Sequence, residues 1–127
     1  NAVVYTGTHD NDTTVGWYTQ APEKERDHVR RYLASDGRHV ALDLLRAAYA
    51  SVADLVIAPM QDVLELPSEA RMNLPGTDAG NWGWRVTFDQ LGEGKAHWLR
   101  DLAMLYGRAG DGEARDTPYR QSQRPSD

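Results

Sequence analysis

The chain has 127 residues, of which 40% are hydrophobic and 26% are charged, and its formal net charge is −5. This length suits one domain, and four Trp with six Tyr support a packed core and argue against disorder throughout. An acidic balance without a basic stripe argues against nucleic-acid or anionic-membrane binding, and no apolar run approaches the roughly 20 residues of a membrane-spanning helix. The absence of cysteine excludes disulfides, and the cytoplasm is the default location.

The first predicted element is a strand over Val3–Thr6, followed by a polar loop over Thr8–Thr14. A buried parallel strand that ends in acidic and imidazole side chains is typical of the open end of an α/β sheet or barrel, where catalytic groups gather. A strand buried on both faces cannot be the first element of a self-sufficient fold. Since the chain begins two residues before it, we expect a C-terminal piece of a larger protein.

Two helices should follow this loop. The first should begin near Pro22, which suits a first helical turn, run to about Ser35 and stop at Gly37. Its apolar face should consist of Val29, Tyr32 and Leu33, spaced i, i+3, i+4. The second, over Val40–Val52, carries apolar residues on more than one stripe, and we expect it to be well buried. These residues are Leu42, Leu44, Leu45, Ala48, Tyr49 and Val52.

A second strand is predicted over Leu55–Pro59. A strand, helices and a strand form a crossover unit, so the two strands should be parallel with a right-handed connection. A short helical turn over Met60–Leu64 and a long loop over residues 68–85 should come next. The final helix should span Lys95–Arg108, with Trp98, Leu99, Leu102, Leu105 and Tyr106 facing inward.

Three segments carry a resemblance to one enzyme family. They are Tyr5–Thr14 with Gly16-Trp17, then Pro59–Leu64, then Ser68–Thr77 with Gly80–Arg85. Together they closely resemble the amylomaltases, the 4-α-glucanotransferases, over residues 3–18 and 54–85. The resemblance implies an α/β fold in which this chain supplies the C-terminal two βα units, strands seven and eight, of a (β/α)8 (TIM) barrel. Such a piece is incomplete as an isolated chain.

The resemblance also implies a chemistry. Enzymes of this family cleave an α-1,4-glucan and pass the donor piece to another sugar through a covalent glucosyl-enzyme, with retention of configuration. The nucleophile and the acid/base follow the fourth and fifth strands, which this chain does not contain. Two carboxyl groups of this kind flank the scissile bond, and further groups bind the sugar hydroxyls as the ring flattens toward an oxocarbenium ion.

Three residues match family site positions. Asp10 matches the carboxylate that stabilises the transition state by accepting hydrogen bonds from the ring 2- and 3-hydroxyls, and His9 matches the neighbouring imidazole. Asn73 matches a polar residue at the rim of the donor site, with bracing of the loop through Asx-type bonds as the alternative. Trp82 and Trp84 could stack on glucose rings or serve as packing anchors.

Several nearby polar residues are predicted to brace the site instead. Asp12 suits an N-cap or loop brace, and Arg71 and Glu69 should pair with neighbours and hold the long loop. Gln61 and Asp62 follow the second strand and should also act as braces. We expect neither a metal nor a cofactor, because Asp10-Asn11-Asp12 lacks the Gly and Glu of a calcium loop and the histidines show no ligand spacing.

The sequence thus predicts a catalytic-barrel part over residues 1–109 and a disordered polar tail over residues 110–127. The expected partners are α-1,4-glucans, malto-oligosaccharides and the N-terminal part of the same enzyme. The isolated chain should be inactive, because a barrel of this kind needs roughly 250 residues. The alternative is a non-catalytic module that binds glucan or associates with a copy of itself through its apolar surfaces.

Overall fold

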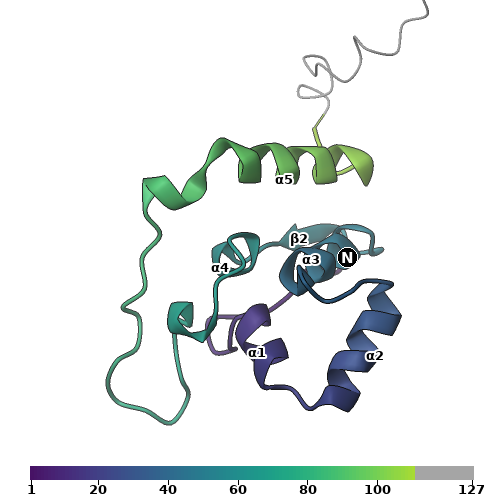
Figure 1. The fold of residues 1–127 in the computed structure, drawn as a ribbon. Helices are drawn as coiled ribbons and strands as arrows, with labels where there is room; N and C mark the ends of the chain where they lie inside the picture. The colour runs from purple at the N-terminus through teal and green to yellow at the C-terminus, as the bar shows by residue number, and fades with distance from the viewer. Residues whose placement is uncertain (111–127) are drawn as a thin grey trace, which may run out of the picture.

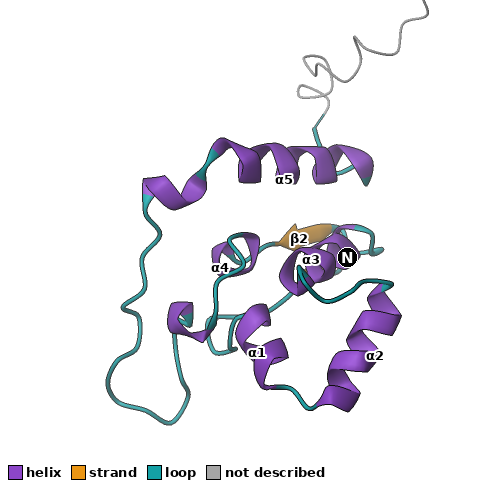
Figure 2. Ribbon diagram, viewed as in Figure 1, coloured by secondary structure: helices purple, strands orange, loops and turns teal. Residues whose placement is uncertain are grey.

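The computed structural model describes residues 1–110, and the predicted disordered tail lies almost entirely outside them. Within these residues the fold has two short parallel strands and five helices, and Figures 1 and 2 label β2 and the helices. The elements are β1 (Val3–Tyr5), α1 (Thr14–Gln20), α2 (Glu23–Leu33), α3 (Val40–Tyr49), β2 (Leu55–Ile57), α4 (Met60–Val63) and α5 (Glu93–Leu105). Single 3-10 turns lie at Ser68–Ala70 and Phe88–Leu91. No helix within the described residues has the length and apolar character needed to cross a bilayer.

The two strands form a parallel pair in which Val3, Val4 and Tyr5 lie opposite Leu55, Val56 and Ile57, which confirms the predicted parallel pairing. Alternate side chains point to opposite faces of a sheet. One face carries Val4 and Val56, which are half-buried where α3 contacts β1. The other face is open and apolar, and its side chains are about half exposed: Val3, Tyr5, Leu55 and Ile57. Within the described residues the strands are thus covered on one face only, and burial of both faces in a larger fold stays a prediction.

The core is centred on α3, as predicted. Val40, Ala41, Leu45 and Ala48 are buried, and the side chain of Leu45 has no exposed surface. The helix ends at Tyr49, so the chain turns before Val52, which is fully exposed rather than inward-facing as predicted.

Helix α1 was not predicted, because its first residues read as the end of a polar loop. It begins because the Thr13 side chain caps it, accepting a hydrogen bond from the Gly16 amide at 3.1 Å. Glycine at position 16 permits a close approach of Asp12 and Ser68, since a Cβ there would lie 2.6 Å from Asp12 Oδ1 and would displace these two side chains. This tight packing fixes the start of α1 against the loop that follows β1.

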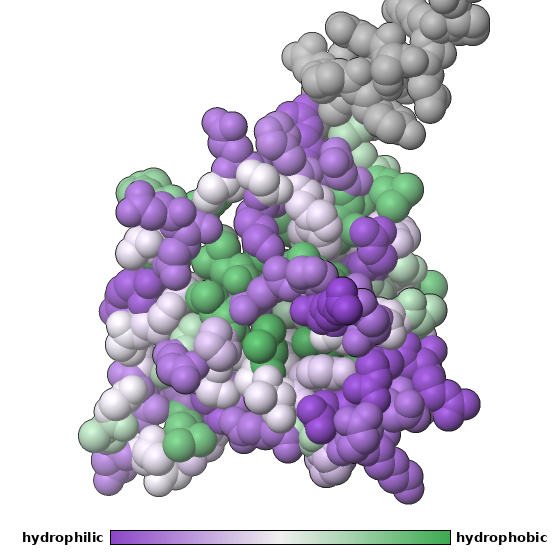
Figure 3. Space-filling model, viewed as in Figure 1, coloured by the Kyte–Doolittle hydropathy of each residue, from purple (hydrophilic) through white to green (hydrophobic). Residues whose placement is uncertain are grey.

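Helix α2 lies on the surface and ends earlier than predicted. Its cap is Ala34 in the left-handed conformation, with φ = 51°, and Gly37 lies three residues farther on. The expected apolar face is confirmed only in part: Val29 and Leu33 are half-buried, but Tyr32 is 80% exposed and no residue of α2 is fully buried. Ion pairs of Glu23 with Arg26 and Arg30 line the helix, and this part of the surface is hydrophilic (Figure 3, lower right).

Helix α5 follows a long excursion of the chain and lies across the rest of the molecule (Figure 1). It begins two residues before the predicted start and ends three before the predicted end. Leu102 is buried against the body, whereas Leu105 is 67% exposed instead of inward-facing. Arg108 lies beyond the helix, and its guanidinium donates to the carbonyls of Tyr49, Ser51 and Ala53 at 2.8 to 2.9 Å. The hydrophobic side chains beneath α5 are visible in Figure 3.

Candidate functional site

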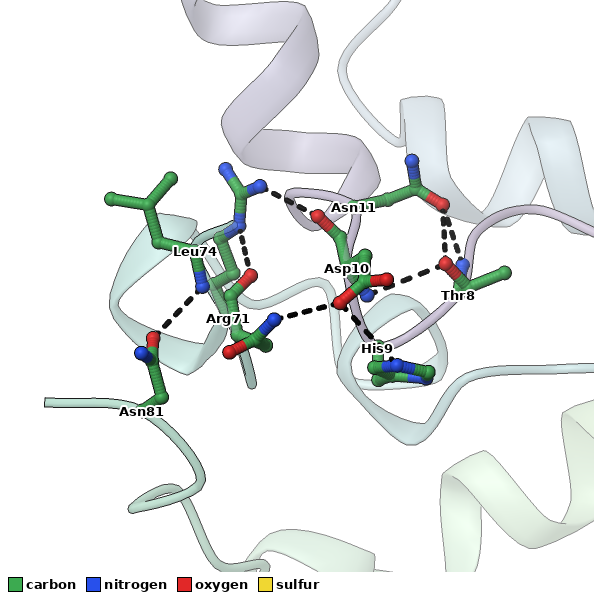
Figure 4. Close-up of polar contacts among 8 residues, drawn as sticks. Thr8, His9, Asp10, Asn11, Arg71, Leu74 and Asn81 are labelled. Atoms are coloured by element: carbon green, nitrogen blue, oxygen red, sulfur yellow. Dashed lines mark hydrogen bonds and ion pairs between the residues drawn. The ribbon is translucent and has the colours of Figure 1, made fainter. Parts of the chain in front are cut away.

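The three predicted site residues meet at the carboxyl edge of the sheet. His9 and Asp10 lie in the loop after β1, and Asn73 lies in the loop that follows the 3-10 turn after β2. Asn73 Nδ2 donates to Asp10 Oδ1 at 2.7 Å, and the Asn73 amide donates to the His9 carbonyl at 3.1 Å. His9 Nε2 lies 3.3 Å from Asp10 Oδ1 (Figure 4). Because parallel strands end at the same edge, residues 63 positions apart come into direct contact.

The Asp10 carboxylate is only partly occupied by protein groups. Its side chain is 50% exposed and that of His9 is 55% exposed. Both contacts converge on Oδ1, and no donor from residues 1–110 reaches Oδ2. Asn73 therefore orients this carboxylate, and one oxygen stays open to an external donor.

Arg71 reaches across the site from the second loop. Its Nη2 donates to the Asp10 carbonyl at 2.6 Å, and its Nε donates to the Asn73 carbonyl at 2.8 Å. The prediction that Arg71 holds the loop is confirmed. Glu69, in contrast, is exposed and forms no hydrogen bond or ion pair with the described part of the chain, so its expected pairing is absent.

A buried network lies beneath the site. The Asp62 carboxylate is 2% exposed and accepts from the Thr14 amide at 2.9 Å, from the Thr14 hydroxyl at 2.8 Å and from the Thr6 hydroxyl. These bonds join the end of β1, the start of α1 and α4. The predicted role of Asp62 as a brace is confirmed.

Asp12 and Gln61 are braces as well, in agreement with the prediction. Asp12 accepts from the Thr13 amide at 2.8 Å and from the Ser68 hydroxyl at 2.8 Å, so it ties the first loop to the 3-10 turn of the second. Gln61 Nε2 donates to the Ala70 carbonyl at 3.2 Å. The two loops that carry the candidate site are thus fastened to each other below it.

A cavity of about 390 Å³ opens beside the site, within the size range of small-ligand pockets. Tyr5 and Ile57 from the open sheet face line it, together with His9, Gln61, Arg71 and Met72. Asp10 does not line this cavity, but its carboxylate contacts His9, which does. The polar cluster therefore lies at the rim of a hollow with an apolar floor.

Trp82 packs against the site, a contact that was not predicted. Its ring centre lies 5.1 Å from that of His9, with the planes tilted by 33°. Its amide donates to the Met72 carbonyl at 2.6 Å, and its backbone takes a left-handed conformation with φ = 60°. Trp82 is about half exposed, and Trp84 is more buried than Trp82.

Two asparagines that sequence reasoning did not single out shape the loops. Asn11 Oδ1 accepts from the Thr8 amide at 2.7 Å and from the Thr8 hydroxyl at 2.9 Å. Asn81 Oδ1 accepts from the Leu74 amide at 2.8 Å (Figure 4). Their position in polar, glycine-containing loops was a usable signal, because Asn side chains commonly close local turns. Over residues 1–110, no group of three His, Asp or Glu residues is placed to hold a metal ion.

Comparison with known proteins yields one consistent family. The family model described as 4-alpha-glucanotransferase matches residues 1–90. A 4-alpha-glucanotransferase of Synechocystis sp. is 53% identical over 111 residues, which cover 85% of this chain and 22% of that protein. The chloroplastic/amyloplastic 4-alpha-glucanotransferase of Solanum tuberosum is 47% identical over 113 residues, which cover 85% of this chain and 19% of the relative.

A solved structure agrees with these relatives. The amylomaltase from Streptococcus agalactiae in complex with acarbose superposes with a TM-score of 0.81 at 32% identity, and the match covers 85% of this chain and 22% of that one. The chain therefore spans about a fifth of the length of the proteins it matches. That the chain forms the C-terminal fifth of such a protein stays a prediction.

Proposed function

Because the chain belongs to the 4-alpha-glucanotransferase family, we propose that it forms part of the donor-sugar site of an enzyme that transfers α-1,4-glucan segments. In this proposal β1 and β2 are strands seven and eight of a (β/α)8 barrel. The open face of Val3, Tyr5, Leu55 and Ile57 would then point into the barrel interior, where branched and aromatic side chains are normally enclosed. Parallel strands are almost always covered on both faces, which supports a larger sheet around this pair.

The observation that carries the proposal is the accessible Asp10 carboxylate, oriented by Asn73 and placed beside His9 at the carboxyl edge of the strands. Barrel active sites gather at this edge. As the glycosidic bond breaks, positive charge develops on the sugar ring, and its 2- and 3-hydroxyls become stronger donors. Oδ2 of Asp10 would accept from them, and the bonds would strengthen in the transition state.

The bond-breaking groups would come from elsewhere in the same enzyme. One carboxylate would attack the anomeric carbon while a carboxylic acid protonates the leaving oxygen, which gives a covalent glucosyl-enzyme. The acceptor hydroxyl would then attack that carbon, and the acid/base would take its proton. Two inversions restore the α configuration. The residues of this chain would bind and orient the ring throughout both steps.

The test is disproportionation of maltotriose by the protein encoded by the full reading frame that contains this chain. We expect redistribution into glucose and longer malto-oligosaccharides, and inhibition by acarbose, which the similar amylomaltase holds. The isolated 127-residue chain should give no transfer products under the same conditions. A full-length protein that leaves maltotriose unchanged would contradict the proposal, as would transfer by the isolated chain at the full-length rate.

The open apolar face also favours a second candidate, a non-catalytic or self-associating module. Four half-exposed apolar side chains lie together on it, and such patches commonly mark interaction surfaces. Sedimentation velocity of the isolated chain separates the possibilities. We expect dimers or larger species that disappear when the rest of the enzyme is present, whereas a stable monomer would contradict the view that this face needs a partner.

A further inference from the structure

We propose that Arg71 is a positioning residue of the glucanotransferase site, because one guanidinium fixes the main chains that carry Asp10 and Asn73. The inference rests on the proposed function. It adds that the distance between the carboxylate and the amide is set by Arg71 and not by the two side chains alone.

The guanidinium of Arg71 donates one hydrogen bond to the main chain of each loop. Nη2 donates to the Asp10 carbonyl at 2.6 Å and Nε to the Asn73 carbonyl at 2.8 Å, although residues 10 and 71 lie 61 positions apart (Figure 4). The guanidinium is planar and rigid, so two bonds from it fix the relative placement of their acceptors. In the described part of the chain Arg71 forms no ion pair with a carboxylate, so its resolved bonds are directed at these two carbonyls.

Arg71 is itself held on the rigid side of the site. Its amide donates to the Ser68 carbonyl at 3.0 Å, where it ends the 3-10 turn of Ser68–Ala70. Ala70 is buried, and the Ser68 hydroxyl is bonded to Asp12. The loop of Asp10 is exposed, in contrast. Arg71 therefore transmits the placement of a buried turn to an exposed carboxylate.

Placement of this kind matters because a displacement of about 1 Å in a site group can lower turnover about 100-fold. A lysine at position 71 would keep the charge, but a single ammonium group does not provide the fixed pair of donors. Arg85 is the matched control. Its Nη1 donates to the carbonyls of Trp82 and Trp84, both at 2.8 Å, so it makes the same kind of bonds farther along the loop without reaching Asp10.

The experiment uses the full-length enzyme with maltotriose. We expect Arg71→Lys and Arg71→Ala to lower kcat about 30- to 100-fold while KM changes less than about threefold. Arg85→Lys and Arg85→Ala should lower kcat by less than about threefold, the range of a surface substitution. Millimolar guanidinium should restore part of the turnover of Arg71→Ala and none of that of Arg85→Ala, a response that a loss of stability would not produce.

Three outcomes overturn the inference. An active parent whose Asp10→Ala variant is inactive but whose Arg71→Lys variant turns over normally would refute the role of Arg71 and leave the proposed function intact. A loss in Arg71→Ala that tracks a lower thermal midpoint and is not rescued by guanidinium would show a merely structural role. If Arg71→Ala fails to fold, the kcat of Arg71→Lys tests the inference instead, because lysine keeps the aliphatic stem and the charge. A parent without transferase activity would remove the proposed function and this inference together.

Discussion

Two carboxylates at the same edge of the sheet have opposite surroundings. Asp62 is 2% exposed, and three donors from Thr6 and Thr14 surround it. Asp10 is half exposed, and both of its side-chain contacts converge on one oxygen. A buried polar group with all its bonds made is a structural element, whereas an oriented carboxylate with an open oxygen is available to a ligand. A position directly after a strand therefore does not by itself identify a functional residue. A side chain there that is oriented but keeps an unbonded oxygen is the better indication.

The two regions also depend on each other. Asp62 joins β1, α1 and α4, and the Asp12–Ser68 bond ties the two loops together. Arg71 then extends this rigid base to Asp10. An exposed loop can hold a side chain precisely enough for catalysis only when a rigid scaffold lies behind it. The substitutions that follow test whether the buried carboxylate serves stability and the open one serves activity.

The largest effect on stability should come from Asp62→Ala in the full-length protein. It leaves the Thr14 amide and two hydroxyls without their acceptor in a buried place, which should cost about 3 kcal/mol of unfolding free energy. Chemical denaturation measures this change. Asp36→Ala is the control, because Asp36 is exposed and should matter by less than about 0.5 kcal/mol. Equal effects of the two variants would erase the distinction between buried and open carboxylates.

A smaller effect, confined to activity, should come from Asn73→Ala. The variant removes the donor at 2.7 Å from Asp10 Oδ1 but leaves the Asn73 main-chain bonds to Arg71 and His9 possible. We expect kcat/KM on maltotriose to fall about tenfold, equivalent to about 1.4 kcal/mol, with an unchanged thermal midpoint. A large drop in the midpoint would instead favour the bracing role that the sequence left open for this residue.

The smallest effect should come from Glu65, a carboxylate between these extremes. Burial alone would raise its pKa, but hydrogen bonds from His39 at 2.7 Å and Lys95 at 3.1 Å outweigh burial and hold the pKa of Glu65 below its usual value. A depressed pKa in the folded state adds stability above the unfolded-state pKa, and this stability is lost as pH falls through the folded-state pKa.

Glu65→Gln should therefore cost less than about 1 kcal/mol at neutral pH, since the partners are partly solvated. The difference from the unsubstituted protein should shrink as pH falls from about 5 to about 3. Thermal unfolding across this range measures it. Glu25→Gln serves as the control, because Glu25 is exposed and forms no ion pair with residues 1–110. A stability difference that grows toward low pH would contradict the assigned sign.

The sequence was most informative where local pattern and fold agree. Parallel pairing follows from a strand, two helices and a strand, and it places the loops that carry His9, Asp10 and Asn73 at one edge. The braces Asp12, Gln61 and Asp62 were also identified, because polar residues at strand ends need partners. Tertiary contacts were not predictable: Ala34 takes a left-handed cap in place of Gly37, and Tyr32 stays exposed although α2 contacts α3. The Trp82–His9 contact joins residues too distant in sequence for any periodicity to indicate it.

The most direct test of the different roles of the two carboxylates is the turnover of full-length Asp10→Asn on maltotriose, expressed per folded molecule. The amide keeps the size of the side chain and removes its charge. We predict a loss of kcat of about 100- to 1,000-fold, the range for a group that stabilises charge in the transition state, at an unchanged thermal midpoint. Turnover within about threefold of the unsubstituted enzyme would contradict the assignment of Asp10 to the donor site.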